Sequence, residues 1–395
     1  MNPNLQQLQP YPFAKLAQLK AGIEEPADLA HIALSIGEPK HAPPAFVRDE
    51  LIDNLDKLSA YPLTKGLDAL RETIANWLCH RFKLDSLSAD TQVIPVNGTR
   101  EALFAFAQAV VSPGSKVLMP NPFYQIYEGA AFLAGATPHF INCSADTQFK
   151  PDFAAVPASV WEQCDLLYLC TPGNPTGALL STDDLKQLIA LADQYDFTIA
   201  SDECYSELYF DEGNAPAGLL QACAELGRND YHRCVVFHSL SKRSNLPGLR
   251  SGFVAGDADI LEKFLLYRTY HGCAMPVPTQ YASIAAWQDE QHVKENRDLY
   301  RQKFDAVLEI LDGCLEVEKP EASFYLWPKV GNGETFAREL FRQQHITVLP
   351  GAYLAREANG VNPGAAYVRM ALVATLEECI EAAKRIRQFC GSNSM

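Results

Sequence analysis

Several features of membrane and secreted proteins are missing from this sequence of 395 residues. No apolar run reaches the roughly 18 residues that a transmembrane helix needs. The first 12 residues are polar, contain three prolines and lack the basic start and apolar stretch of a signal peptide. No block of five or more basic residues occurs, which argues against a polybasic membrane anchor. We therefore expect a soluble, cytoplasmic protein without a membrane partner.

Basic residues and paired cysteines are also scarce. Lysine and arginine number 33 against 48 acidic residues, and the net charge of −15 argues against a nucleic-acid partner. The 11 cysteines are scattered from Cys79 to Cys390, and none forms a CxxC pair. The sequence therefore predicts neither a metal site nor a thioredoxin-like motif. We expect free thiols in a reducing cytosol.

What remains is the composition of a globular protein, with 48% hydrophobic and 21% charged residues. The length indicates two or three domains, at about 150 residues per domain. In the middle of the chain, near-continuous apolar runs alternate with helical patterns, which is typical of parallel strands covered on both faces. Helices are expected at Thr99–Val111 and Thr182–Tyr195. Strands are expected at Gln92–Val96, Lys116–Met119, Thr137–Ile141, Asp165–Cys170, Phe197–Ser201, Cys234–His238 and Gly252–Ala255.

After about Met275 the pattern changes to one long helical stretch through about residue 312. Shorter elements follow, at Ser323–Trp327, Glu334–Gln343, Ile346–Leu349, Ala366–Ala371 and Leu376–Phe389. The sequence thus predicts an α/β fold, with a mostly parallel central sheet flanked by helices and a smaller α+β C-terminal domain. The expected division is an N-terminal arm over 1–44, a large domain over 45–275 and a small domain over 276–395. We expect the arm to pack on the small domain or on a partner subunit.

Lys242 is the first candidate for chemistry, because it follows the apolar run Cys234–His238. Ligands of α/β folds bind at the carboxyl ends of such strands. Ser239, Ser241 and Arg250 stand close to it in sequence and suit an anion such as phosphate. Taken alone, a surface-loop lysine is the more common interpretation of such a residue.

Three other segments stand at strand ends. Asp202 follows the run Phe197–Ser201, although an isolated aspartate there is more often a helix cap. The Pro- and Gly-rich segment 171–177 is, by itself, a turn. The segment 97–100 lies between a strand and a helix, where free backbone N–H groups favour phosphate binding. It matches neither GxGxxG nor GxxxxGK[ST], so neither nucleotide motif applies.

Taken together and in order, these segments resemble the class I and II aminotransferases, which are pyridoxal-phosphate enzymes of fold-type I. The resemblance spans most of the chain, and no matched position lacks its expected residue type. The matching positions are Gly37, Tyr61, Gly66, Leu70, Arg71, Gly98, Thr99, Arg100, Pro122, Phe123, Tyr124, Pro172, Asn174, Pro175, Thr176, Gly177, Asp202, Tyr205, Ser239, Ser241, Lys242, Arg250, Gly252 and Arg369.

The resemblance implies a role for each residue around the ring of the cofactor. Lys242 should hold pyridoxal phosphate covalently and then move the proton of the substrate Cα. Asp202 should pair with the pyridine nitrogen, which keeps the ring protonated as an electron sink. Asn174 and Tyr205 should bind the phenolic oxygen of the ring, and Tyr124 should stack on its face.

The resemblance also implies a phosphate site and a homodimer with shared active sites. Tyr61 should reach the phosphate of the partner subunit. The remaining cofactor-binding residues should be Gly98, Thr99, Arg100, Ser239, Ser241 and Arg250.

The expected substrates are an amino acid and a 2-oxo acid. Arg369 should clamp the substrate α-carboxylate near Gly37 and Asn174. Arg100 is the candidate second cation for a distal carboxylate, although it could also face solvent or pair with an acid.

Segments 239–253 and 97–103 look most like the bacterial succinyldiaminopimelate aminotransferases. This implies transfer from glutamate to N-succinyl-2-amino-6-oxopimelate in lysine biosynthesis. The alternatives are broader aspartate or aromatic specificity, or a lyase of the same fold.

Overall fold

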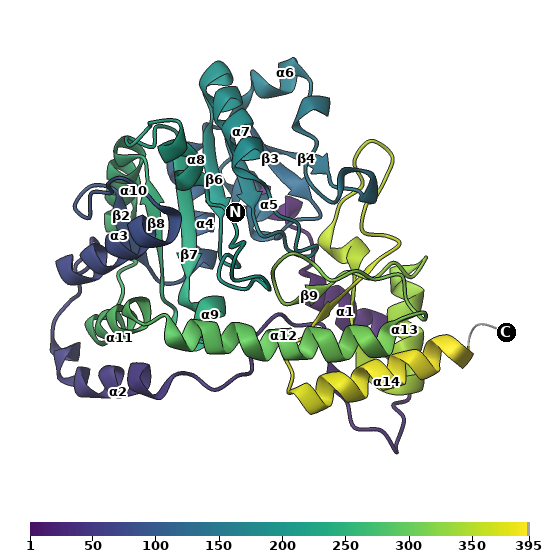
Figure 1. The fold of residues 1–395 in the computed structure, drawn as a ribbon. Coiled ribbons are helices and arrows are strands. Elements are labelled where there is room, and N and C mark those ends of the chain that lie inside the picture. Colours follow the sequence, from purple (N-terminus) through teal and green to yellow (C-terminus); the bar gives the residue numbers. More distant parts are fainter. Residues whose placement is uncertain (393–395) are drawn as a thin grey trace.

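The computed structural model describes residues 1–392 (Figure 1). A seven-stranded sheet forms its centre, in the order β2-β8-β7-β6-β5-β3-β4. The strands are β2 (Val93–Val96), β3 (Lys116–Asn121), β4 (Thr137–Asn142), β5 (Cys164–Cys170), β6 (Thr198–Asp202), β7 (Cys234–Ser239) and β8 (Gly252–Gly256). Strand β8 runs antiparallel to its neighbours β2 and β7, whereas β7, β6, β5, β3 and β4 pair in parallel. The prediction of a mostly parallel sheet is confirmed.

Helices cover both faces of this sheet, which explains why its strands are apolar runs rather than alternating patterns. One face packs against α4 (Thr99–Val110), α5 (Ile126–Leu133) and α10 (Ala258–His271). The other face packs against α3 (Asp68–Phe82), α7 (Thr182–Tyr195), α8 (Leu219–Glu225) and α11 (Val277–Gln288). Three further helices are α2 (Ala45–Asp53), α6 (Ala158–Trp161) and α9 (Leu240–Arg243).

The C-terminal part contains α12 (Gln291–Leu311), β9 (Tyr325–Leu326), α13 (Gly333–Gln344), β10 (Ile346–Thr347), β11 (Leu349–Pro350), β12 (Val368–Ala371) and α14 (Leu376–Ser392). Strands β11, β12 and β9 form a small antiparallel sheet. A separate cluster of buried side chains joins β9, β10 and β12 to α12, α13 and α14. This cluster is distinct from the two that flank the central sheet.

The expectation of one long helical stretch through residue 312 is wrong. The chain leaves helical geometry at Asp289, whose backbone is extended, and α12 then begins at Gln291. The carboxylate of Asp289 accepts a hydrogen bond from the N–H of His292 at 2.9 Å. It therefore supplies a partner to the free N–H groups at the start of α12.

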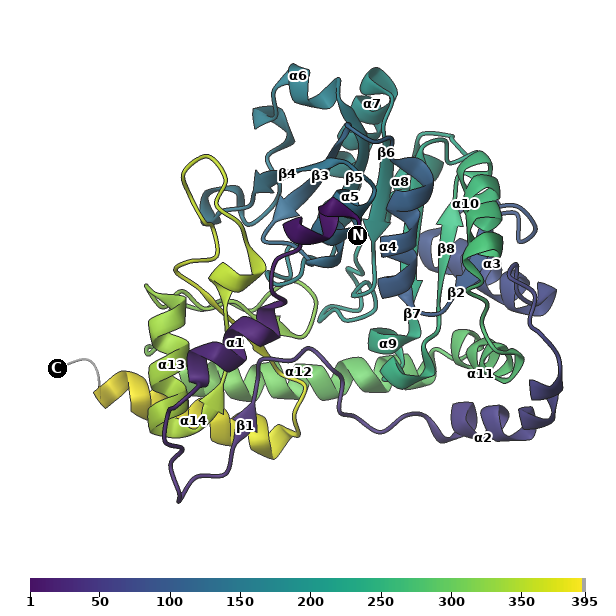
Figure 2. The same cartoon turned by 180° about the vertical axis from the view of Figure 1, so that it is seen from behind.

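The predicted strand Ile346–Leu349 is also divided in two. Its first half, β10, pairs in parallel with β1 (Ile32–Ala33), whereas β11 pairs with β12. The N-terminal arm thus contributes a strand beside the C-terminal part, and α1 (Pro12–Lys20) lies against α13 (Figure 2). The division into an arm and two domains at residues 44 and 275 stays a prediction.

The structure also bears on the expectations about membrane helices and cysteine pairing. Within residues 1–392, no helix is long and apolar enough to cross a membrane. All 11 cysteines are free thiols.

Candidate active site

A cavity of about 390 Å³ lies at the carboxyl ends of β5, β6 and β7, and residues of the arm and of β11 also line it. All predicted site residues line it except Gly98 and Tyr61. Parallel strands end at the same edge of a sheet, and this brings residues far apart in sequence to one place. Asp202 pairs in register with Cys170 on one side and Phe237 on the other.

Lys242 extends from the short helix that follows β7. The hydroxyl of Ser239, the last residue of β7, caps this helix by accepting from the N–H of Ser241 at 3.1 Å. The Lys242 ammonium donates to the carbonyl of Gly37 at 2.5 Å. Burial lowers the pKa of Lys242 to about 8, and the nearby Arg369 acts in the same direction. The neutral amine that nucleophilic attack requires is therefore accessible near neutral pH.

Asp202, the last residue of β6, is buried beneath the cavity. Its carboxylate accepts hydrogen bonds from the hydroxyl of Tyr127 at 2.8 Å and from the N–H of Cys204 at 3.3 Å. Burial raises the pKa of Asp202, and these donors oppose the rise. The Tyr127 ring is held by stacking on Tyr168, with 4.6 Å between ring centroids.

The sequence interpretation missed Tyr127 as a partner of Asp202. No local pattern indicated it, because Tyr127 of α5 and Asp202 are 75 positions apart in the sequence.

Arg369 is buried on β12, and within residues 1–392 no carboxylate is among its hydrogen-bond partners. Its guanidinium donates to the side-chain oxygen of Asn174 at 3.0 Å and to the carbonyl of Ser35 at 2.7 Å. Its Nε has no hydrogen-bond partner in the part of the chain that the structure describes. A buried cation of this kind is stabilised by an anion, and the cavity that Arg369 lines has room for an anionic ligand.

Two neighbours shape the space around Arg369. The hydroxyl of Tyr205 lies 2.9 Å from that of Tyr325, whose ring faces the guanidinium at 4.3 Å. The Tyr325 hydroxyl also occupies the place that a Cβ on Gly37 would take. Only glycine therefore fits position 37 without displacing Tyr325. Sequence interpretation missed Tyr325, which lies far from the matched motifs.

The start of α4 forms a cup for an anion. Gly98 has a φ of +84°, which favours glycine, and a Cβ there would overlap the guanidinium of Arg250. The hydroxyl of Thr99 lies beside the Cys204 thiol at 3.1 Å, and that of Ser239 donates to the Ser241 hydroxyl at 2.9 Å. Hydroxyls, a cation and a helix N-terminus together suit a phosphate group.

Arg100 lines the cavity, and among residues 1–392 the hydrogen-bond partners of its guanidinium are hydroxyl groups. It donates to the hydroxyl of Tyr124 at 2.8 Å and to that of Tyr11 at 2.6 Å. Tyr11 belongs to the arm, and nothing in the local sequence pointed to it. Both hydroxyls are neutral, so the positive charge of Arg100 is left uncompensated at the cavity.

Of the two predicted residues that do not line the cavity, Gly98 lies against Arg250, which lines it, whereas Tyr61 does not contribute to the cavity. Its side chain is fully exposed. Other apolar side chains in the same part of the chain are exposed as well, namely Ile52, Leu55, Leu58 and Leu63. Exposed apolar clusters of this kind are typical of protein–protein interfaces.

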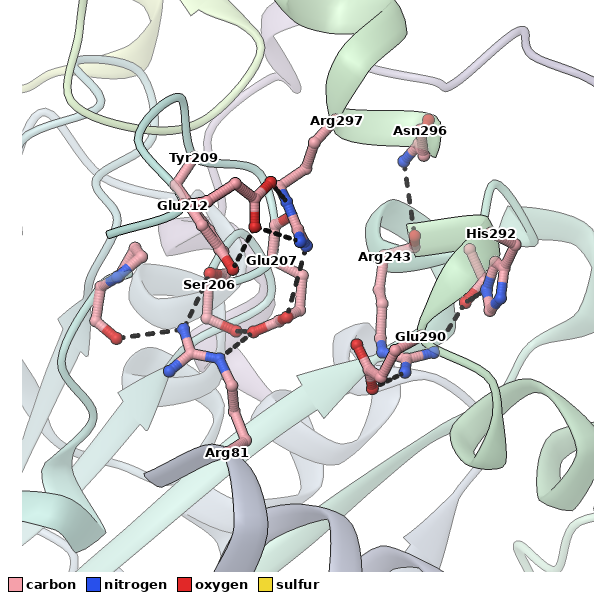
Figure 3. Close-up of polar contacts among 12 residues, drawn as sticks. Arg81, Ser206, Glu207, Tyr209, Glu212, Arg243, Glu290, His292, Asn296 and Arg297 are labelled. Atoms are coloured by element: carbon pink, nitrogen blue, oxygen red, sulfur yellow. Dashed lines mark hydrogen bonds and ion pairs between the residues drawn. The ribbon is translucent and has the colours of Figure 1, made fainter. Parts of the chain in front are cut away.

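Two groups of paired charges, each containing a buried arginine, lie near the segment that carries Lys242 (Figure 3). Arg243, next to Lys242, donates to the carbonyl of Ala286 and to Glu290. Glu207, close after Tyr205, accepts from Arg81 at 2.8 Å. Arg297 of α12 lies 3.9 Å from Glu207. These pairs neutralise charges that would otherwise be costly to bury.

The residues present fit pyridoxal phosphate. A lysine with a lowered pKa, a buried carboxylate on the neighbouring strand and a phosphate cup lie around one cavity. A mostly parallel sheet with these groups at its carboxyl edge defines the class of fold-type I pyridoxal-phosphate enzymes. When bound, the cofactor supplies an electron sink for negative charge at the substrate Cα.

Comparison with known proteins gives the family within that class. Residues 30–386 match the family described as Aminotransferase class I and II, and the chain belongs to this family. It is 31% identical to the LL-diaminopimelate aminotransferase of Nitratidesulfovibrio vulgaris over 387 residues, which cover 96% of each chain.

Two solved structures add to this likeness. An aminotransferase from Neisseria meningitidis is 51% identical with a TM-score of 0.95, over 98% of this chain and 100% of the other. A probable N-succinyldiaminopimelate aminotransferase from Thermus thermophilus is 26% identical with a TM-score of 0.84, over 95% and 99%. The protein is a pyridoxal-phosphate-dependent aminotransferase.

Proposed function

We propose that this aminotransferase moves an amino group between glutamate and N-succinyl-2-amino-6-oxopimelate in lysine biosynthesis. The observation that carries the proposal is the pair of arginines in one cavity, Arg369 and Arg100, each with neutral hydrogen-bond partners. Arg369 takes the α-carboxylate. Arg100 takes a carboxylate further along the substrate, which glutamate and the succinylated substrate both carry.

The other residues of the cavity have roles that follow from their positions. Lys242 would hold the cofactor, and it would remove the Cα proton of the substrate as general base and return it as general acid. Asp202 would hold the protonated ring nitrogen of the cofactor. Asn174 and Tyr205 would bind its phenolic oxygen, and Tyr124 would cover its ring. Arg369 fixes the α-carboxylate so that the Cα–H bond is the one that breaks.

The phosphate is held by the cup at the start of α4 and α9, whose members are Gly98, Thr99, Ser239, Ser241 and Arg250. Tyr61 completes the cup of a partner subunit in a homodimer. The full exposure of Tyr61 in the single chain, beside exposed apolar side chains, supports this arrangement. The expected location of the protein is the cytoplasm.

The names of the similar proteins support a substrate with a diaminopimelate skeleton. They leave the N-acyl group open, since the Nitratidesulfovibrio relative is named for LL-diaminopimelate and the Thermus structure for the succinylated form. LL-diaminopimelate itself is therefore the second candidate. An aminotransferase of broader aspartate or aromatic specificity and a lyase are the other readings of the same site.

The test is a panel of single-turnover reactions on the cofactor-loaded enzyme. Each amino donor is mixed with the enzyme, the change in cofactor absorbance is followed, and the 2-oxo acid product is identified by mass spectrometry. The panel contains glutamate, N-succinyl-LL-diaminopimelate, LL-diaminopimelate, aspartate and phenylalanine. For glutamate and N-succinyl-LL-diaminopimelate we expect the highest ratios of the single-turnover rate constant to the apparent dissociation constant. A preference for LL-diaminopimelate supports the second candidate, and release of ammonia or cleaved products would identify a lyase.

A further inference from the structure

One segment of the N-terminal arm meets the catalytic residues through backbone atoms. The carbonyl of Ser35 accepts from Arg369 at 2.7 Å, and the carbonyl of Gly37 accepts from Lys242 at 2.5 Å. A short strand pairing joins the arm to β10 just before this segment. Four residues after Gly37, the side chain of His41 enters a polar cluster on α12.

His41 contacts two buried side chains of α12 through its two ring nitrogens. Nδ1 lies 2.9 Å from the side-chain oxygen of Asn296, and Nε2 lies 2.6 Å from the ammonium of Lys303. An ammonium group can only donate hydrogen bonds, so Nε2 must accept and Nδ1 must carry the proton. The ring also packs on Tyr300, with 4.8 Å between centroids. His41 is thus held in one tautomer and one orientation.

Asn296 continues the chain of hydrogen bonds to the catalytic loop. Its amide nitrogen donates to the carbonyls of Lys242 at 3.2 Å and Arg243 at 3.4 Å, and its oxygen also accepts from Asn245 at 2.9 Å. Figure 3 shows Asn296 beside Arg243, in the group that also contains Glu290 and His292. The cluster therefore joins three elements: the arm, α12 and the loop that carries Lys242.

We propose that His41, acting through Asn296 and held by Lys303, is a positioning residue that couples the arm to the backbone of the catalytic lysine. This inference rests on the role of Lys242 proposed above. It assigns a function to the half-buried His41 and the buried Asn296 and Lys303, none of which lines the cavity. Without His41, the arm carbonyls of Ser35 and Gly37 and the Lys242 loop would lose their shared anchor.

The coupling should depend on pH in a defined direction. Burial lowers the pKa of His41, the hydrogen bond to Asn296 opposes this, and Lys303 lowers it further. Protonated His41 would present a second cation to Lys303, so the contact is present at neutral pH and is lost as pH falls below the ordinary histidine range. The other ionisable groups that face the pair are Lys40 of the arm and Glu377, Glu378 and Cys379 of α14.

Two measurements on the cofactor-loaded protein test the coupling without turnover. In NMR spectra with ¹⁵N-labelled histidine, His41 should appear as the Nδ1–H tautomer at pH 7.5. In hydrogen exchange, His41→Phe should speed exchange over residues 240–245 about three- to thirtyfold, since the ring packing stays and the hydrogen bonds are lost. His31→Phe is the matched control, because His31 is an arm histidine that binds Thr347 at 2.8 Å instead. It should leave residues 240–245 unchanged.

Activity supplies a third readout. The kcat/KM of the wild-type enzyme should fall at acidic pH, as His41 becomes protonated. The kcat/KM of His41→Phe should be about tenfold lower at neutral pH and should not show this acidic decrease. An Nε2–H tautomer, or unchanged exchange over 240–245 in His41→Phe, would overturn the proposal. If His41→Phe does not fold, Lys303→Gln serves instead, because glutamine keeps a hydrogen-bond donor and removes the charge. This variant should raise the pH at which His41 titrates. An unchanged titration midpoint of His41 would overturn the coupling. A wild-type enzyme without transaminase activity would contradict only the proposed function.

Discussion

Replacing Arg100 with glutamine separates substrate recognition from cofactor binding. The guanidinium donates to the hydroxyls of Tyr124 and Tyr11, and glutamine keeps an uncharged N–H donor at this position. The walls of the cavity should therefore keep their shape. What the variant loses is the positive charge at the cavity mouth.

The size of the effect follows from the kind of contact that is lost. A hydrogen bond between charged groups contributes about 1.5–3 kcal/mol, and each 1.4 kcal/mol is about a tenfold change in binding. Arg100 is partly open to solvent, which screens its charge, so the lower part of this range applies. We expect the apparent KM for glutamate and other acidic substrates to rise about ten- to thirtyfold. The KM for alanine and phenylalanine should change about twofold or less.

The assay is steady-state transamination at fixed, saturating 2-oxo acid, with the amino donor varied. Tyr11→Phe is the matched control, since it removes one hydroxyl partner of Arg100 and keeps the ring and the charge. It should shift the KM for acidic donors in the same direction by a smaller factor, about two- to fivefold. Equal losses for acidic and neutral donors in Arg100→Gln would show that Arg100 supports the cofactor. An unchanged KM for glutamate would remove it from the substrate site.

Four further outcomes are expected. Lys242→Ala should bind pyridoxal phosphate noncovalently, as followed by fluorescence quenching, but turn over about 10²- to 10⁴-fold more slowly, and near-normal turnover would contradict its role. Asp202→Ala should slow proton removal in stopped-flow single turnovers far more than it weakens cofactor binding. Tyr127→Phe should slow proton removal less, by about three- to tenfold. Normal rates in Asp202→Ala would refute the role of Asp202. Because burial lowers the pKa of Lys242 to about 8, covalent capture of the cofactor by the cofactor-free protein should speed up as pH rises to about 8 and level off above it; a rate still rising tenfold per pH unit at pH 10 would be inconsistent with this. Mixing inactive Tyr61→Ala and Lys242→Ala subunits should restore activity through hybrid dimers with one intact site, and no recovery would mean that Tyr61 serves no partner.

The strands of the central sheet were predictable because the sequence of each strand carries its own signal. Strands covered on both faces are continuous apolar runs, so β5, β6 and β7 could be located from composition alone. Lys242 and Asp202 follow or end such runs, and parallel strands bring their carboxyl ends together. The candidate site was therefore visible as residues at strand ends before any contact was known.

The errors have a common cause in long-range contacts. The run Ile346–Leu349 reads as one strand, and only its pairing with β1 on one side and β12 on the other divides it. The break between α11 and α12 contains neither glycine nor proline, and it depends on the capping carboxylate of Asp289.

The missed residues of the site have the same explanation. Tyr11 meets Arg100 across 89 positions, and Tyr325 meets Tyr205 across 120 positions. His41 meets Asn296 across 255 positions. No local pattern encodes pairs of this kind, because each residue taken alone reads as an ordinary polar or aromatic side chain.

The most direct test of the central claim is a single-turnover reaction of the wild-type enzyme with glutamate and no 2-oxo acid. We predict a shift of the cofactor absorbance to that of its amine form, with one 2-oxoglutarate released per active site. Adding N-succinyl-2-amino-6-oxopimelate should then reverse the shift and yield the aminated product. If the cofactor-loaded enzyme showed no absorbance shift with glutamate or with any other donor of the panel, the result would contradict the assignment as an aminotransferase.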